Sequence, residues 1–316
     1  MRKIRTSTTV QPQSTARQFM IRPAGFGFNR ETRPTNAFQH SGGLPADLSG
    51  VARDEFDRMA DHLVSAGVEV TVFEDINGLE TPDAVFPNNW ISLHQSGKVV
   101  LYPMMAPNRR KERRPDIIDS LREKFHVEDI IDLTHFENEG KYLEGTGSMV
   151  LDRRYKIAYA AISPRTHPEP LQAFSEALGY EIVQFHASDK NNVPIYHTNV
   201  MMCVGDSFAV VCLEALKNED ERHNLRSVLE ETEKFVIEIS LDQVAAFAGN
   251  MLLVRNNAGQ KMMVMSTSAF ESLTAQQKMM LEEFTSRLVY VDIPAIEATG
   301  GGSARCMLAE IHLPLK

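Results

Sequence analysis

Residues 148–185, SMVLDRRYKIAYAAISPRTHPEPLQAFSEALGYEIVQF, contain one complete structural unit of this chain. The apolar runs 148–152 and 156–160 predict two short strands, and the apolar period of residues 168–178 predicts a helix. A third strand is expected over residues 181–185. This order of strand, strand, helix and strand is the module on which the whole chain is built.

The same order of elements recurs about every fifty residues. The preceding copy has expected strands at 89–94, 99–103 and 129–133 and a helix at 115–125. The following copy has strands at 199–204, 207–211 and 234–239 and a helix at 219–232. A further copy has strands at 250–255, 261–265 and 288–291 and a helix at 275–284. The pattern therefore predicts repeated ββαβ units.

The two ends of the chain hold the pieces of a fifth unit. These pieces are expected strands at 19–22, 68–73 and 306–312 and a helix at 54–66. Pairing of the ends would close a ring and remove the exposed sheet edges that invite aggregation. We expect one α/β domain over residues 1–316, with an ordinary open α/β sheet as the alternative.

The composition favours a globular protein without nucleic-acid or membrane partners. The 316 residues are 43% hydrophobic, and 33 basic against 42 acidic residues leave a formal charge of −9. Nucleic acids and anionic membranes favour clustered Lys and Arg. The one basic run, 109–114, is interrupted by Glu112 and is interpreted as a solvated helix start. No stretch is apolar enough for a membrane span or a secretory signal, which favours a cytoplasmic protein.

The three cysteines limit the chemistry further. Cys203, Cys212 and Cys306 form no Cys-x-x-Cys pair and cannot all be paired. This pattern argues against a disulfide framework or a zinc site and favours a reducing compartment. No glycine-rich phosphate-binding motif is present, so nucleotide binding has no support.

Candidate reactive residues fall at one place in successive units, the turn that leads into the first strand. These turns read PDAVFPNN (82–89), LEGTG (143–147), YHTN (196–199) and GGGSARC (300–306). Core packing alone does not predict this placement. In a closed ring the turns would converge on the axis and form one site.

A cysteine and a histidine in these turns carry the main chemistry. Cys306 follows three glycines, which leave room for a substrate to approach the sulfur, and a thiolate is a strong nucleophile. His197 is the only one of ten histidines in a converging turn. Its imidazole could protonate a departing amine and then activate water. Cys203 and Cys212, in apolar surroundings, are interpreted as buried structural residues.

Two carboxylates stand in the other turns. Glu144, in a tight Glu-Gly-x-Gly turn, could orient His197 or hold a substrate nitrogen. Asp83 could bind a guanidinium or accept from a ureido N–H. An ordinary turn aspartate after proline is the alternative for Asp83.

These motifs resemble those of a known superfamily. Gly-Gly-Gly-x-x-Arg-Cys-Met near the C-terminus, Glu-Gly-x-Gly in the middle and Pro-Asp-x-Val-Phe earlier are similar to arginine deiminase, agmatine deiminase and dimethylargininase. The chain most resembles the arginine deiminase-related branch of citrulline utilisation hydrolases. The resemblance implies a five-bladed α/β propeller (pentein) with pseudo-fivefold symmetry. It also implies a Cys, His and carboxylate site without metal or cofactor.

The resemblance assigns roles to individual positions. Cys306 corresponds to the covalent nucleophile, His197 to the proton shuttle and Glu144 to the carboxylate that supports them. Asp83 matches a contact to substrate nitrogen. Arg165 resembles the arginine that binds the substrate α-carboxylate, with a surface arginine as the alternative.

Departures from the family pattern bear on the substrate. Asn88 and Asn89 stand where deiminases place a carboxylate, and Asn199 replaces the aspartate of a His-x-Asp motif. A neutral ureido group is satisfied by an amide, whereas a buried guanidinium needs a charge. This favours citrulline-like substrates, although succinylarginine dihydrolases carry asparagine in this region and accept a guanidinium. The arginine of dimethylargininase before Ala-Pro-x-Arg-Arg is replaced here, with Pro103 and Met104 in that region.

The expected function is hydrolysis of a C–N bond in a ureido or guanidino amino acid through a covalent S-linked intermediate. Alternatives within the superfamily are an amidinotransferase and an arginine dihydrolase or deiminase. The alternative of another class is a non-catalytic binding module, as in ribosome-binding propellers. The expected partner is a small amino-acid substrate. For the assembly, a homodimer is kept as an alternative to a monomer.

Overall fold

The computed structural model describes residues 11–40, 42–43 and 45–316. In these ranges the named strands form five three-stranded sheets. The middle strand of every sheet pairs antiparallel with the first strand and parallel with the third. A helix connects each middle strand to its parallel neighbour. The predicted ββαβ repeat is therefore confirmed.

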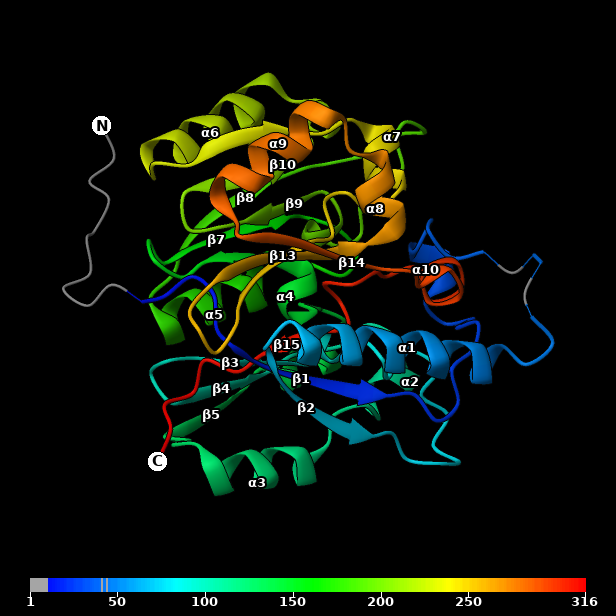
Figure 1. The fold of residues 1–316 in the computed structure, drawn as a ribbon. Coiled ribbons are helices and arrows are strands. Elements are labelled where there is room, and N and C mark those ends of the chain that lie inside the picture. The colour runs from blue at the N-terminus through cyan, green and yellow to red at the C-terminus, as the bar shows by residue number, and fades with distance from the viewer. Residues whose placement is uncertain (1–10, 41, 44) are drawn as a thin grey trace.

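Each structural role recurs in all five sheets (Figure 1). The first strands are β3 (Ile91–Leu93), β6 (Val150–Asp152), β9 (Met202–Val204), β12 (Leu252–Arg255) and β15 (Ala309–Glu310). The middle strands are β1 (Arg17–Arg22), β4 (Lys98–Leu101), β7 (Ile157–Ala161), β10 (Phe208–Val211) and β13 (Lys261–Ser266). The third strands are β2 (Glu69–Glu74), β5 (Asp129–Asp132), β8 (Glu181–Phe185), β11 (Phe235–Glu238) and β14 (Arg287–Val291). The connecting helices are α1 (Leu48–Ser65), α3 (Pro115–Lys124), α5 (Pro168–Leu178), α6 (Glu219–Glu231) and α9 (Ala275–Phe284).

The two ends of the chain share one sheet, as predicted. β15 pairs antiparallel with β1, and Gln18 lies opposite Glu310. The expected strand 306–312 is reduced to Ala309–Glu310, because Cys306 and Leu308 donate backbone hydrogen bonds to Ser303 and Arg305 and form tight turns. The C-terminal strand is thus short, and Cys306 lies in the turn before it.

Short helical turns precede three of the first strands and replace their predicted first residues. These turns are Pro87–Asn89 before β3, α4 (Gly145–Ser148) before β6 and Thr198–Val200 before β9. The helices α2 (Pro107–Arg110), α7 (Leu241–Ala245), α8 (Thr267–Ser272) and α10 (Pro294–Gly300) were not predicted. The turns matter because Asn88, Asn89 and Asn199 lie in them, and Glu144 and His197 directly precede two of them.

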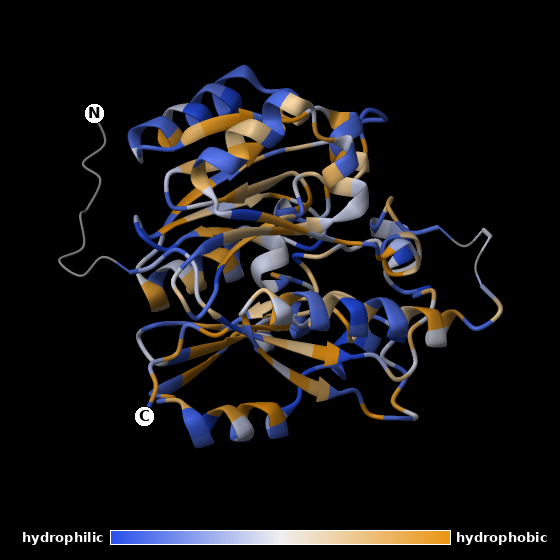
Figure 2. Cartoon of the chain, in the orientation of Figure 1, coloured by the Kyte–Doolittle hydropathy of each residue, from blue (hydrophilic) through white to orange (hydrophobic). Residues whose placement is uncertain are grey.

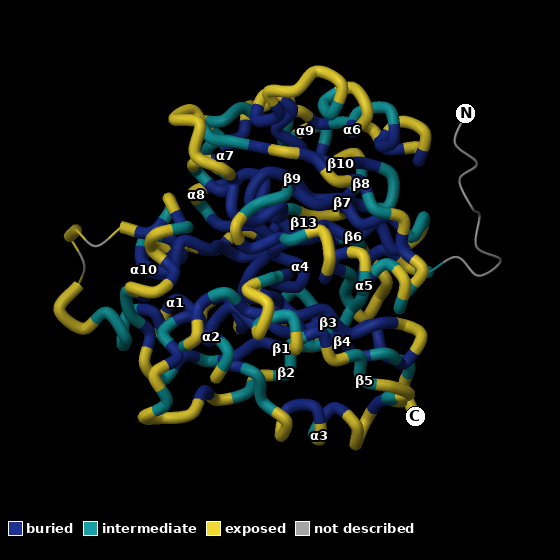
Figure 3. Tube along the Cα trace, turned by 180° about the vertical axis from the view of Figure 1, so that it is seen from behind, coloured by how far each residue is buried: buried dark blue, intermediate teal, exposed yellow. Residues whose placement is uncertain are grey.

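First strands of neighbouring sheets contact one another: β15 packs on β3, β6 on β9, and β9 on β12. Helices α3, α6 and α9 lie at the periphery, while α4 lies near the middle of the molecule (Figure 1). Apolar residues concentrate in the strands and polar residues on the outer helices (Figure 2). The strands are mostly buried, and the helices turn exposed residues outward (Figure 3).

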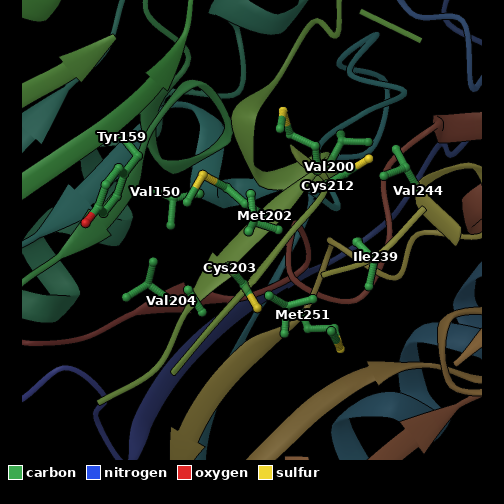
Figure 4. Close-up of a cluster of buried hydrophobic side chains, with 14 of the residues drawn as sticks. Val150, Tyr159, Val200, Met202, Cys203, Val204, Cys212, Ile239, Val244 and Met251 are labelled. Atoms are coloured by element: carbon green, nitrogen blue, oxygen red, sulfur yellow. The ribbon is translucent and has the colours of Figure 1, made fainter. Parts of the chain in front are cut away.

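The largest hydrophobic cluster includes two of the three cysteines (Figure 4). Cys203 and Cys212 pack among residues such as Met202, Val204 and Met251. Burial raises the pKa of both thiols to about 12, so neither is a thiolate near neutral pH. Their interpretation as structural residues is confirmed. No helix in the described ranges is long and apolar enough to cross a lipid bilayer.

Candidate active site

The turns before the first strands meet around one small pocket. Its volume of about 10 Å³ is room for about one water molecule. The lining residues are Asn36, Asp83, Phe86, Asn89, Arg109, Arg165, Tyr196, His197, Gly300, Gly302 and Cys306. Five predicted site residues therefore line one pocket, although they come from three of the converging turns and, for Arg165, from the segment after β7.

Of the remaining three predicted residues, two lie directly behind this lining. Glu144 contacts His197, and Asn199 contacts Cys306. Asn88 lies one step further out, where its amide donates to the hydroxyl of Thr146 at 3.4 Å. The structure thus brings seven of the eight predicted residues into the pocket lining or into contact with it.

Cys306 presents its sulfur to two asparagine side chains. Asn199 Nδ2 lies 3.3 Å from Cys306 Sγ, and Asn250 Nδ2 lies 3.2 Å from it. The cysteine is only 3% exposed. The sulfur is therefore held between two neutral hydrogen-bond donors.

His197 and Glu144 form a buried pair. His197 Nε2 lies 2.8 Å from Glu144 Oε2. Burial, together with the nearby Arg165 and Arg109, lowers the pKa of His197 to about 4 against the opposing effect of Glu144. Burial alone would raise the pKa of Glu144, but Arg165, His197 and Arg109 together hold it well below its usual range. At neutral pH the pair is therefore a carboxylate and a neutral imidazole.

This pairing selects one tautomer of His197. A carboxylate only accepts hydrogen bonds, so Nε2 carries the proton and Nδ1 is left as the basic nitrogen. The Glu-Gly-x-Gly turn makes room for this arrangement. A Cβ on Gly147 would lie 2.4 Å from Asn89 Nδ2 and 2.7 Å from His197 Nδ1. Glycine at this position therefore lets the two side chains approach the turn.

Asp83 is buried with one unpaired oxygen. Its Oδ2 accepts from Asn29 Nδ2 at 2.7 Å and lies 3.8 Å from Arg109 Nε. Its Oδ1 has no hydrogen-bond partner within the described part of the chain. Burial raises the pKa of Asp83, although Arg109 and Asn29 oppose the shift. Asp83 thus offers a free acceptor to a ligand in the pocket.

Arg109 corrects the interpretation of the basic run 109–114 as solvated. It is only 2% exposed, and its guanidinium donates two hydrogen bonds to Glu112, at 2.9 and 2.8 Å. Its Nη1 donates to Asn89 Oδ1 at 2.9 Å. The interpretation was wrong because charge alternation is typical of a solvated face, whereas here Glu112 neutralises Arg109 inside the protein.

Arg165 is also buried, so the alternative of a surface arginine is wrong. Its Nη2 donates to the carbonyl of Thr32 and to Thr35 Oγ1, both at 2.8 Å. The guanidinium carbon lies 4.8 Å from the ring centre of Tyr196. Its Nη1 is 3.5 Å from Glu144 Oε2. Arg165 therefore joins the catalytic candidates to the segment that contains Thr32 and Thr35.

That segment, residues 29–40, covers the pocket and is called the covering segment. Besides its bonds to Asp83 and Arg165, it is held by Asn36 Nδ2, which donates to the carbonyl of Gly300 at 3.2 Å. Phe38 packs against Tyr196 with ring centres 6.0 Å apart. Asn36 of this segment lines the pocket, whose volume is too small for an amino acid.

The sequence comparison with protein families supplies the classification. The model of the eukaryotic N,N-dimethylarginine dimethylhydrolase family matches residues 22–313. The chain belongs to this family. Members of the dimethylarginine dimethylhydrolase family cleave C–N bonds of guanidino compounds, and the chain is accordingly a hydrolase of carbon–nitrogen bonds. The predicted superfamily is confirmed.

Solved structures show the same fold. The N-terminal domain of ArgZ, an arginine dihydrolase of the cyanobacterial ornithine–ammonia cycle, aligns with a TM-score of 0.73 at 17% identity and covers 94% of this chain and 98% of that domain chain. Full-length AgrE with ornithine and NAD+ aligns at 0.73 and 16% identity, covering 95% of this chain but 40% of AgrE. Dimethylarginine dimethylaminohydrolase with an S-methyl-L-thiocitrulline adduct aligns at 0.63 and 15% identity, covering 96% and 100%. No curated protein sequence matches the chain.

Two residues of the site were missed by sequence reasoning. Arg109 was assigned to the surface, and Asn250 was treated only as the start of a strand. A signal existed for Asn250, because Asn89 and Asn199 occupy the same place in their own units. Family membership gives neither residue a role, and their contacts are the basis for the proposals below.

Proposed function

We propose that this chain is a cysteine-dependent hydrolase of a ureido amino acid, with citrulline as its substrate and Cys306 as its nucleophile. The mixture of unpaired hydrogen-bond donors and acceptors around the pocket is the observation that supports a ureido substrate. Among the residues that the structure describes, Asn89 Nδ2 is a donor without a partner, while Asp83 Oδ1 and Asn199 Oδ1 are acceptors without one. All three atoms belong to residues that line the pocket or contact the sulfur.

A ureido group complements this mixture. It has one carbonyl oxygen, which needs a donor, and N–H groups, which need acceptors. A guanidinium has N–H donors only, so it would leave Asn89 Nδ2 facing another donor. Asn89 cannot simply rotate its amide, because its Oδ1 accepts from Arg109, whose guanidinium is always a donor. We assign the binding of the substrate's α-carboxylate to the two buried arginines, Arg109 and Arg165.

The proposed reaction begins with proton transfer from the Cys306 thiol to neutral His197. The sulfur then forms a bond to the ureido carbon. As the tetrahedral intermediate collapses, the C–N bond breaks and His197 returns the proton to the departing amine. Glu144 stabilises the transient imidazolium, as its charge and its hydrogen bond favour the protonated ring.

The second half of the reaction releases the product. A water molecule gives its proton to His197, its oxygen bonds to the same carbon, and the C–S bond breaks. With citrulline, ornithine departs in the first half and leaves an S-carbamoyl intermediate. Water releases this group as carbamic acid, and the proton on His197 returns to the Cys306 thiolate. Carbamic acid then breaks down to carbon dioxide and ammonia, so the sum is ornithine, carbon dioxide and ammonia.

The propeller architecture, the single domain and the cellular location are part of the same proposal. The five sheets make one closed, five-bladed pentein propeller in a single domain over residues 1–316. Contacts between neighbouring first strands and the sheet shared by both chain ends support closure. A cytoplasmic location is supported by three free cysteines, which a reducing compartment preserves.

A second candidate is an arginine dihydrolase. The similarity to the fold of ArgZ and the free oxygen of Asp83 favour it. A dihydrolase would release two ammonia molecules for each ornithine, whereas citrulline hydrolysis releases one. The ratio of ammonia to ornithine therefore separates the two activities.

The test is a panel of citrulline, arginine, methylated arginines and agmatine with wild type and the Asn89→Asp variant. We expect citrulline to be the best substrate of wild type. In Asn89→Asp the donor becomes an acceptor, so kcat/KM for citrulline should fall by about a hundredfold, with a smaller loss for guanidino substrates. Higher wild-type kcat/KM for arginine than for citrulline would refute the ureido assignment.

A further inference from the structure

We infer that Asn250 is a further catalytic residue, whose side-chain amide donates to the Cys306 thiolate and fixes the sulfur for attack. The inference rests on the proposed role of Cys306 as nucleophile. Asn250 lies in the turn before β12, the one such turn that the sequence did not single out for chemistry. It is fully buried.

The orientation of the Asn250 amide is set by two backbone groups. Its Oδ1 accepts from the N–H of Arg305 at 3.1 Å. Its Nδ2 donates to the carbonyl of Asn199 at 3.1 Å. A flipped amide would place a donor against a donor and an acceptor against an acceptor. One hydrogen on Nδ2 is therefore committed to Asn199, and the other is directed at Cys306 Sγ, 3.2 Å away.

The backbone holds Asn250 where this contact is made. Its N–H donates to the carbonyl of Phe247 at 2.8 Å, and Phe247 has a φ of 62°, which a non-glycine residue rarely adopts. A Cβ on Gly249 would lie 2.3 Å from the carbonyl oxygen of Val200 and 2.7 Å from the Cα of Met201. The turn is thus packed tightly against the turn of Asn199, and such strained backbone is typical of functional sites.

A neutral substrate explains why two amides are needed. A guanidinium in the pocket would itself stabilise a thiolate by charge, but a ureido group has none. Hydrogen bonds to the charged form of a group favour that form, and donors to an anion are stronger than neutral ones. In the described ranges, the hydrogen-bond partners of Cys306 Sγ are the side chains of Asn199 and Asn250.

Other ionisable groups surround the sulfur and are common to wild type and variants. Those lining the pocket are Asp83, Arg109, Arg165, Tyr196 and His197. Glu144 lies behind His197. Arg305, next to Cys306 in the chain, directs its guanidinium to the carbonyl of Leu308 and to Glu310. A change in the thiol titration on substitution of Asn250 alone is therefore attributable to the lost amide.

The experiment measures the alkylation rate of Cys306 by iodoacetamide from pH 5 to 10 in the full chain without substrate. Wild type, Asn250→Ala and Asn250→Asp are compared, and Cys306→Ala gives the background from Cys203 and Cys212. Asn256→Ala, at a half-buried turn position of the same unit outside the pocket lining, is the matched control. Circular dichroism and Tm identify variants that fold.

We expect the apparent pKa of alkylation to rise by about one unit in Asn250→Ala. The rise should be larger in Asn250→Asp, which keeps the shape but adds a negative charge. The kcat at pH 7 should fall by about ten- to a hundredfold in Asn250→Ala and recover in part at pH 9. Asn256→Ala should match wild type.

Unchanged titration of Cys306 in a folded Asn250→Ala or Asn250→Asp variant would overturn the inference, as would a rate loss that does not depend on pH. If Asn250→Ala does not fold, the isosteric Asn250→Asp alone decides. Because alkylation needs no substrate, its outcome is separate from the substrate panel: a chain that prefers arginine over citrulline can still show the shift.

Discussion

His197 Nε2 lies 2.8 Å from Glu144 Oε2, and both side chains are buried, His197 in the lining of the pocket that contains Cys306 and Glu144 behind it. The two residues are separated by 53 positions in the chain and come from the turns before two different sheets. Their contact therefore depends on how the sheets pack, and it sets both the tautomer and the basicity of the imidazole.

The Glu144→Gln variant tests this pairing. An amide can accept from Nε2 but cannot stabilise the imidazolium by charge, so kcat should fall by about 10² to 10⁴. KM should change less than kcat. The matched control is Glu139→Gln, an exposed carboxylate five residues earlier, which should keep wild-type kcat. A Glu144→Gln variant with wild-type kcat would show that the carboxylate has no part in proton transfer.

Gly147 offers a purely steric test of the same histidine. Alanine there would place a methyl group 2.7 Å from His197 Nδ1 and 2.4 Å from Asn89 Nδ2, so one of these side chains must move. We expect Gly147→Ala to lose at least about a hundredfold in kcat, because small displacements of catalytic groups are costly. Gly25→Ala, where a Cβ meets nothing within 4 Å, is the control. Equal kcat values for the two variants would contradict the role given to the turn.

Glu297 provides a prediction about pH and stability. It is buried in α10 beneath the glycine run, and Ser303 Oγ donates to it at 2.5 Å. Burial raises its pKa to about 7, from 4.5 in an unfolded chain. Between pH 4.5 and 7, Glu297 is protonated in the folded state but ionised in the unfolded state. The contribution of the protonated side chain to the unfolding free energy is therefore complete below pH 4.5 and is lost as pH rises through 7.

The Glu297→Gln variant should be free of that loss. The difference in unfolding free energy between variant and wild type should move in favour of the variant by on the order of 2–3 kcal/mol from pH 5 to pH 8. Denaturant unfolding at both pH values measures it, and Glu283→Gln on the exposed face of α9 is the control. A difference that is constant with pH would mean that Glu297 is ionised in the folded protein throughout.

The covering segment gives a prediction about motion. Its amides donate within the segment, from Thr35 to Thr32 and from Gln39 to Asn36, and to α10, from His40 to Ala298. Because the pocket is too small for an amino acid, we expect these bonds to open during turnover. In hydrogen exchange by mass spectrometry, residues 29–40 should exchange faster than α1 in the free Cys306→Ala protein and slow down with saturating citrulline. Equal protection with and without citrulline would be evidence against closure of this segment over the substrate.

Much of this arrangement could be predicted from the sequence, because the repeat gives each turn the same place in its unit. The helices Pro168–Leu178 and Ala275–Phe284 begin and end where their apolar period predicts. The first strands do not, since Asn89, Ser148 and Asn199 lie in helical turns whose backbone geometry depends on neighbouring sheets. Local pattern carries no information about such contacts.

The charge pattern gave a wrong prediction for the exposure of Arg109 for a related reason. Arg109 and Glu112 look like a solvated pair along the chain, yet they are buried as a bidentate ion pair beside Asn89 and Asp83. Whether such a pair faces water is decided by the elements that cover it. The covering segment, which bonds to Asp83 and Arg165 at the site, was not among the elements that the repeat pattern predicts.

The role of Cys306 as the nucleophile is tested most directly by ammonia and ornithine release from citrulline. Wild type is compared with Cys306→Ala, and Cys212→Ala is the matched buried control. Wild type and Cys212→Ala should release both products in a one-to-one ratio. Cys306→Ala should be at least about a thousandfold slower, since its nucleophile is gone. Cys306→Ala activity within tenfold of wild type would contradict a covalent mechanism on Cys306.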